Sequence, residues 1–255
     1  MASIAANQPI SARRAPHPLW VRWLHWIMAG AVMTLAVSGS VILASHPRLY
    51  WGETGNDMTP ALIELPISRN YRHGGWEPSL PFRGAPNGAI TAARTYDIFN
   101  QNGWGRSLHF LAAWIMVIGG GAYVLTGTFT GHLRRVIMPK TADLAPAALV
   151  RDVADHAALR IPAKAGPPYG PLQKIAYSSV VLLFLPLMVL TGLAMSPQIG
   201  AATGLMALFT GSQSARTIHF AGFAMIFLFI LVHVVMVLLS GPRRHLAAMI
   251  LGRTR

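Results

Sequence analysis

Four long stretches of almost uncharged residues divide the chain into apolar segments and the polar loops between them. They cover approximately residues 21–44, 108–130, 175–195 and 217–240. A helix rises ~1.5 Å per residue, so ~20 apolar residues cross a hydrocarbon layer of ~30 Å. The pattern therefore predicts an all-α integral membrane protein, with a four-transmembrane-helix bundle over residues 20–245. Residues 1–19 and 246–255 are predicted to be tails outside this membrane domain.

The segments between the spans differ in length and character. Residues 45–106 are rich in proline, glycine and aromatic residues, and we predict that they are structured but irregular. A loop of this length is usually functional or a docking surface. In the second loop, the apolar positions from Pro146 to Ile161 predict a short amphipathic helix on the membrane surface. Residues 196–215 are predicted to form a short apolar turn, and Pro186 is predicted to kink the third span.

The basic residues are distributed unevenly between the two sides of the membrane. Four spans put both termini on one side, which carries fourteen of the 21 basic residues but three of the eight acidic residues. The positive-inside rule therefore predicts a multi-pass protein of a bacterial inner membrane, with both termini cytoplasmic and the 45–106 loop periplasmic. The basic residues flank the spans and do not form one patch, so the net charge of +13 does not indicate nucleic-acid binding.

Four histidines lie inside the predicted spans, where an imidazole is costly unless it has a partner. His219 and His233 are fourteen residues apart, which is close to four helical turns, so they share one helix face and lie ~21 Å apart along it. The alternating direction of the helices places His25 beside His233 at the cytoplasmic end and His109 beside His219 at the periplasmic end. His132 and His156 fall in the second loop and are predicted to be solvated.

Two pairs of imidazoles at two depths are typical of two b-type haems, each with axial ligands from facing helices. Both axial positions are then filled, which favours one-electron transfer over oxygen chemistry. A zinc or copper site would instead need three or four ligands at one depth, and packing alone is a poor explanation for four matched histidines. The chain contains no cysteine, which excludes thiolate metal sites, iron–sulfur clusters and covalent haem attachment. No residue is predicted to be catalytic.

An arginine precedes three of these histidines by three residues. The three are Arg22 before His25, Arg106 before His109 and Arg216 before His219. This spacing puts a guanidinium group one turn outward from each ligand, where the haem propionates would emerge. The alternative is that these arginines only anchor the ends of the spans.

These residues resemble a known family. His25 in RWLHW, His109 in GRSLHF and the pair His219 and His233 resemble the cytochrome b561-like membrane cytochrome b subunits of formate dehydrogenase, nickel–iron hydrogenase and thiosulfate reductase. The stretch YGPLQKIAYSSVVLLFLPLMVLTGLAMSP, together with HPRLYWGETG in the first long loop, is most similar to the thiosulfate reductase type. The resemblance covers residues 17–245.

The resemblance implies an electron-transfer subunit of an oxidoreductase complex. Such subunits carry electrons between the membrane quinone pool and a periplasmic partner, often a molybdopterin enzyme or an iron–sulfur subunit. It also implies a quinone site near the haem of His25 and His233, with the partner on the side of the 45–106 loop. Two alternatives stay open: a free-standing dihaem quinone oxidoreductase acting on a small molecule, and a haem-free scaffold or transporter.

Overall fold

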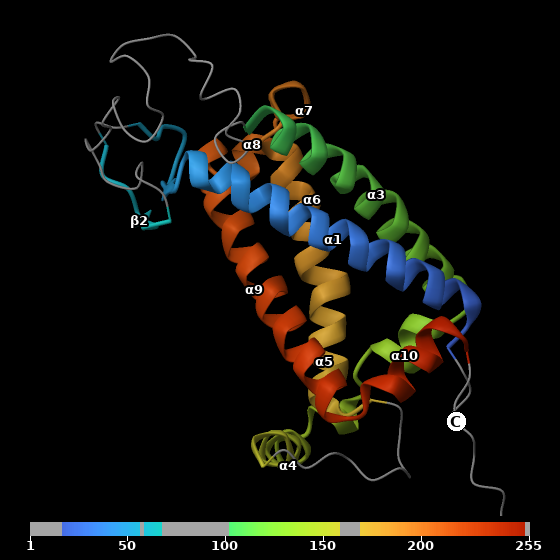
Figure 1. Ribbon diagram of the computed structural model, residues 1–255. Coiled ribbons are helices and arrows are strands. Elements are labelled where there is room, and N and C mark those ends of the chain that lie inside the picture. Colours follow the sequence, from blue (N-terminus) through green and yellow to red (C-terminus); the bar gives the residue numbers. More distant parts are fainter. Residues whose placement is uncertain (1–16, 57–58, 68–101, 159–168, 253–255) are drawn as a thin grey trace, which may run out of the picture.

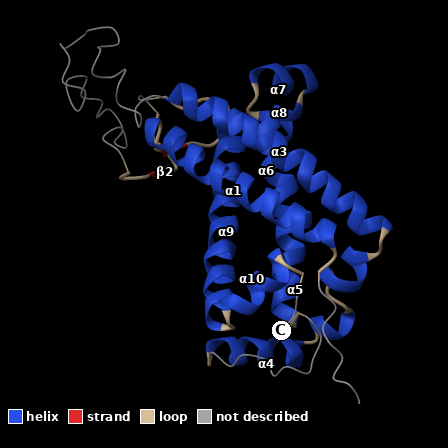
Figure 2. Ribbon diagram, turned by 45° about the vertical axis from the view of Figure 1, so that its right-hand side comes forward, coloured by secondary structure: helices blue, strands red, loops and turns tan. Residues whose placement is uncertain are grey.

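The computed structural model describes residues 17–56, 59–67, 102–158 and 169–252, and these are mostly helical (Figures 1 and 2). Within them, four helical segments are long and apolar enough to cross a membrane, which confirms the four predicted spans. The first is α1 (Leu19–Ser45), the second lies in α3 (Asn102–Phe129), the third runs from Pro171 to Ala194, and the fourth is α9 (Ser212–Leu239).

The four spans form two antiparallel pairs. Helix α1 packs along α3, and the third span packs along α9 (Figure 1). One end of the bundle carries the short antiparallel strands β1 (Arg48–Leu49) and β2 (Ile63–Glu64), and we call it the hairpin end. The opposite end carries α10 (Pro242–Ile250), and we call it the α10 end. Many outward apolar side chains are exposed, Phe129 at 87% for example, as expected for a surface that faces lipid.

The third span is built from three consecutive pieces. These are α5 (Pro171–Ser179), the π-helix η5 (Val180–Phe184) and α6 (Leu185–Ala194). The sequence predicted a kink at Pro186, which lacks an N–H and cannot donate to the carbonyl four residues earlier. In the structure the wider π-helical turn ends at Phe184, just before this proline. The backbone hydrogen-bond pattern therefore changes where the proline removes a donor.

Helix α9 begins at Ser212, about one turn before the predicted boundary, because the first loop caps it. The Gly52 carbonyl accepts hydrogen bonds from the backbone N–H groups of Gln213 (3.1 Å) and Ser214 (3.3 Å). These are free donors at the start of a helix that would otherwise need a side-chain cap. Gly211 precedes them with φ of +132°, and a Cβ placed on it would lie 2.3 Å from the Gly52 oxygen. Only glycine fits there.

Short helices occupy several segments that the sequence predicted as irregular. The predicted turn at 196–215 contains α7 (Pro197–Thr203) and α8 (Leu205–Leu208), and the predicted C-terminal tail overlaps α10. The predicted amphipathic helix is α4 (Pro146–Ala157), which ends before the expected Ile161, a residue outside the described ranges. It follows a π-helical turn, η3 (Leu133–Ile137), and a 3-10 turn, η4 (Thr141–Leu144).

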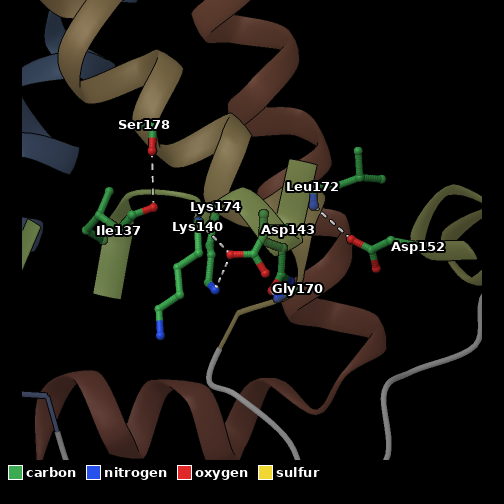
Figure 3. Close-up of polar contacts among 9 residues, drawn as sticks. Ile137, Lys140, Asp143, Asp152, Gly170, Leu172, Lys174 and Ser178 are labelled. Atoms are coloured by element: carbon green, nitrogen blue, oxygen red, sulfur yellow. Dashed lines mark hydrogen bonds and ion pairs between the residues drawn. The ribbon is translucent and has the colours of Figure 1, made fainter. Parts of the chain in front are cut away.

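The loop between α3 and α5 is fastened to the start of the third span by three polar contacts (Figure 3). The Lys174 ammonium lies 2.8 Å from the Asp143 carboxylate, and the Leu172 N–H donates to the Asp152 carboxylate at 2.8 Å. The Ser178 hydroxyl donates to the carbonyl of Ile137 at 3.1 Å. The polar side of α4 thus faces the protein through Asp152, while Val150 and Val153 are exposed.

The sequence predicted that the two loop histidines are solvated, but in the structure both are partly buried and make contacts. His156 is half-buried and its Nδ1 lies 3.4 Å from the Asp152 carboxylate and 2.7 Å from the carbonyl oxygen of the same residue. His132 packs edge-on against Trp20 and Tyr123, with ring centroids 5.3 and 6.3 Å away. Burial among these rings lowers the pKa of His132. The aromatic contacts of His132 depend on packing against Trp20, far away in the sequence, whereas the carboxylate beside His156 belongs to Asp152, one helical turn earlier.

Candidate functional site

The histidine of the first span and the second histidine of the last span meet at the α10 end. The rings of His25 on α1 and His233 on α9 have centroids 6.4 Å apart and planes inclined by 59°. Helix α9 runs from the hairpin end to the α10 end and α1 runs the opposite way, so His233 near the end of α9 reaches the level of His25 near the start of α1.

A second pair forms at the hairpin end. The rings of His109 on α3 and His219 on α9 have centroids 6.3 Å apart and planes inclined by 56°. His109 lies about two turns into α3 and His219 two turns into α9, and both helices begin at this end. The structure therefore brings the four histidines together in the two pairs that the sequence predicted.

The separation within each pair suits a single metal ion between the two rings. Imidazole nitrogens bind a transition metal at ~2.0–2.1 Å, and the ring centre lies ~1 Å beyond the nitrogen, so two rings on opposite sides of one ion have centroids about 6 Å apart. The described residues contain no group of three or more His, Cys, Asp or Glu side chains that could hold a metal by themselves. Two protein ligands per site therefore fit a porphyrin, which supplies the other four nitrogens.

Aromatic side chains surround the pair at the α10 end. The ring of His233 stacks on Phe229, with centroids 5.8 Å apart and planes 20° apart, and it meets Tyr177 edge-on at 6.3 Å. The His25 ring meets Trp26 edge-on at 5.3 Å. Among the described residues, no hydrogen bond to either imidazole of this pair is found. This end is thus an apolar, aromatic environment of the kind that suits a flat macrocycle.

Hydroxyl groups contact the pair at the hairpin end. The Oγ of Ser38 lies 3.0 Å from Nδ1 of His109, and the Oγ1 of Thr191 lies 2.8 Å from Nδ1 of His219. Sequence analysis missed both residues. Thr191 comes from the third span, which carries none of the four histidines. Serine and threonine are common in membrane helices because they bond their own backbone, so nothing in the local sequence marks these two.

Glycines let both hairpin-end rings approach the neighbouring helices closely. A Cβ added at Gly39 would lie 3.3 Å from Cε1 of His109, and one added at Gly192 would lie 3.7 Å from Cε1 of His219. The first distance is shorter than an ordinary van der Waals contact. An alanine in place of Gly39 would therefore require a small shift where α1 passes the His109 ring.

The three predicted propionate partners lie at span ends. Arg22 donates from Nε to the carbonyl of Met249 at 3.2 Å and also bonds the carbonyl of Ile250, which ties the start of α1 to α10. Arg216 bonds the His46 carbonyl, and Arg106 is exposed near the start of α3. A guanidinium carries five N–H donors, so the observed bonds leave donors available in Arg22 and Arg216.

Comparison with known proteins identifies the family of the chain. Residues 16–252 match the family model described as prokaryotic cytochrome b561. A protein from Azospira oryzae, named as a protein-methionine-sulfoxide reductase subunit, YedZ1, is 29% identical over 238 residues, covering 93% of this chain and 96% of that protein. No solved structure matches the chain. The chain belongs to the prokaryotic cytochrome b561 family. It is a multi-pass membrane cytochrome b that uses b-type haem for transmembrane electron transfer.

Proposed function

We propose that the chain binds two b-type haems, one at each histidine pair, and carries electrons between the membrane quinone pool and a periplasmic redox enzyme. The observation that carries this proposal is the presence of two facing imidazole pairs, with centroids 6.4 and 6.3 Å apart, at opposite ends of one bundle. His219 and His233 on α9 are ~21 Å apart along the helix axis, so the two sites lie at two depths of one membrane.

The residues proposed to hold each haem have distinct tasks. His25 and His233 would hold the haem iron at the α10 end, and His109 and His219 would hold the haem iron at the hairpin end. Each haem, when bound, supplies an iron that accepts and returns one electron. Two imidazoles on each iron would leave no position open for oxygen, which favours electron transfer. Arg22, Arg106 and Arg216 are proposed to neutralise propionates at the span ends.

The orientation of the protein follows from its charges. The positive-inside rule favours a cytoplasmic α10 end and a periplasmic hairpin end in a bacterial inner membrane. We propose that quinone exchanges electrons beside the α10-end haem, at the end of the bundle that carries Arg22 and the exposed Arg134. Lys174 at the same end is buried and paired with Asp143. The redox partner would dock at the hairpin end, which the 45–106 loop enlarges. Most of that loop lies outside the described residues.

The name of the relative indicates the class of partner. The Azospira oryzae protein is named as a subunit of a protein-methionine-sulfoxide reductase, which consumes electrons. For this chain we therefore propose flow from quinol through the two haems to a periplasmic reductase, in line with the molybdopterin or iron–sulfur partner implied by the sequence resemblance. Reduction of oxidised methionine needs two electrons, which two one-electron steps would deliver.

A single purification tests this function against its alternatives. Two b-type haems per chain, reduced by a quinol analogue and reoxidised by a second subunit that co-purifies in mild detergent, would support the proposal. Haem reduced by quinol and reoxidised by a small molecule, with no second subunit, would favour a free-standing oxidoreductase. A colourless membrane fraction would favour a scaffold or transporter.

A second experiment, in vesicles, tests the position of the quinone site. The variant His25→Ala should lose rapid reduction by quinol. Undiminished reduction of the remaining haem would move the quinone site to the hairpin end.

A further inference from the structure

We propose that Ser38 and Thr191 are positioning residues that set the tautomer of His109 and His219 and lower the redox potential of the hairpin-end haem. The inference rests on the proposed haem ligation by this pair. It concerns two hydroxyl groups that would not touch the iron and would act through the imidazoles that bind it.

Each hydroxyl already donates its hydrogen to a backbone carbonyl on its own helix. The Ser38 hydroxyl donates to the carbonyl of Thr34, and the Thr191 hydroxyl donates to the carbonyl of Leu187, both at 2.7 Å. A hydroxyl has one hydrogen and two lone pairs, so an oxygen whose hydrogen is already donated can only accept a further hydrogen bond. For Ser38 the donor of that further bond is Nδ1 of His109, 3.0 Å away.

The same holds for Thr191, whose oxygen lies 2.8 Å from Nδ1 of His219. Nδ1 must therefore carry the ring hydrogen in both histidines. In a neutral imidazole the other nitrogen, Nε2, then keeps its lone pair, which is the form that a metal binds. The two hydroxyls thus favour this tautomer and help to orient both rings before any haem is present.

The two residues come from the two spans that give this pair no ligand. Ser38 lies on α1 and Thr191 lies on α6, while α3 and α9 carry the histidines. Both side chains are fully buried, with 0% relative exposure, so water cannot replace a lost hydroxyl without rearrangement. All four spans therefore meet at the hairpin-end pair, two through imidazoles and two through hydroxyls.

The α10-end pair is built differently, which makes it an internal reference. Its rings contact Trp26, Tyr177 and Phe229, and no hydrogen bond to either ring is found in the part of the chain that the structure describes. A ligand imidazole that donates its second N–H becomes more basic and stabilises the oxidised iron. The hydroxyls should therefore lower the potential of one haem and leave that of the other unchanged.

Redox titration of the purified dihaem protein tests the inference. Thr191→Val keeps the shape of the side chain but removes the hydroxyl, and Thr191→Ser keeps the hydroxyl. We expect the midpoint potential of the hairpin-end haem alone to rise in Thr191→Val and in Ser38→Ala, and to stay near the wild-type value in Thr191→Ser. Ser40→Ala is the matched control, because the Ser40 hydroxyl bonds the carbonyl of Ala36 at 2.8 Å and contacts no histidine.

The outcomes separate this inference from the proposed function. Two bound haems with unchanged potentials in Ser38→Ala and Thr191→Val would overturn the inference and leave the function standing. An equal rise in Thr191→Ser and Thr191→Val would also overturn it, since packing and not the hydroxyl would then be responsible. A wild-type protein without haem would overturn both. Ser38 and Thr191 are on different helices, so one variant that fails to assemble leaves the other to decide.

Discussion

The imidazole of His25 lies opposite that of His233, with ring centroids 6.4 Å apart, although the two residues belong to the first and last membrane spans. Neither ring has a hydrogen-bond partner among the described residues, and an unpartnered imidazole in a membrane span is costly. A metal ion held between the rings would remove this cost by binding both. The rings of His109 and His219 have nearly the same spacing, with centroids 6.3 Å apart, but these two imidazoles have hydroxyl partners in Ser38 and Thr191.

The first prediction concerns haem content. Changing any one of His25, His109, His219 or His233 to alanine should lower the haem content from two per chain toward one, because one imidazole cannot hold a six-coordinate low-spin iron. The pyridine haemochrome assay measures this ratio. His156→Ala is the control, since His156 lies in the loop and contacts Asp152, and it should keep both haems. Full haem content in a variant would remove that histidine from the ligand set.

The second prediction concerns the pairing of the ligands. His25→Ala and His233→Ala should remove the same component from a redox titration, and His109→Ala and His219→Ala should remove the other. The physical reason is that each pair shares one iron, so losing either ring has the same result. Loss of one and the same component in His25→Ala and His219→Ala would contradict the pairing and the geometry of the bundle.

The third prediction concerns the arginines at the span ends. If Arg22, Arg106 and Arg216 hold propionates, Arg→Gln should lower the potential of the adjacent haem, because a nearby cation stabilises the less positive, reduced state. Potentiometric titration of each variant measures the shift. Arg151→Gln on the exposed side of α4 is the control. Potentials that do not move would indicate that the arginines only anchor the spans, as the backbone bonds of Arg22 and Arg216 would allow.

The fourth prediction concerns the junction between the first loop and α9. Gly211→Ala should destabilise the protein by about 1–3 kcal/mol, because alanine disfavours a φ of +132° and its Cβ would collide with the Gly52 carbonyl. That collision displaces the cap of the helix that carries His219. Thermal loss of the haem absorbance band measures the effect. Gly103→Ala, where an added Cβ meets nothing within 4 Å, should be nearly neutral. Equal stability of the two variants would argue against the cap.

The fifth prediction concerns pH. The hydrogen bond from Lys174 holds the pKa of Asp143 below its ordinary value. The folded pKa lies below the unfolded one, so the stabilisation is present above the unfolded pKa of about 4 and is lost as the pH falls through the folded pKa. Asp143→Asn should therefore be less stable than the wild type at neutral pH, and the difference should shrink on acidification. Thermal unfolding across pH measures this, with Glu53→Gln as control. A pH-independent difference would contradict the ion pair.

The sequence by itself determined the four spans and the two histidine pairs. The bilayer imposes a minimum apolar length on a helix that crosses it. Each span can therefore be identified from its own residues, without reference to the neighbouring helices. Helix periodicity then places His219 and His233 on one face, and alternating helix direction fixes which end each histidine occupies. These are properties of single segments, and the structure confirms the spans and brings the predicted histidines together.

Only the tertiary structure decided what surrounds those histidines. Ser38 and Thr191 meet their imidazoles across helix interfaces, and the local sequence of each resembles that of any other hydroxyl residue in a membrane helix. The same applies to Gly52, which caps α9 from a distant loop, and to α10, which meets Arg22 through backbone carbonyls. Such contacts depend on distances of a few ångströms between segments far apart in the chain. The hydrophobic pattern specifies which segments cross the membrane, but not the side-chain contacts between them that create these hydrogen bonds.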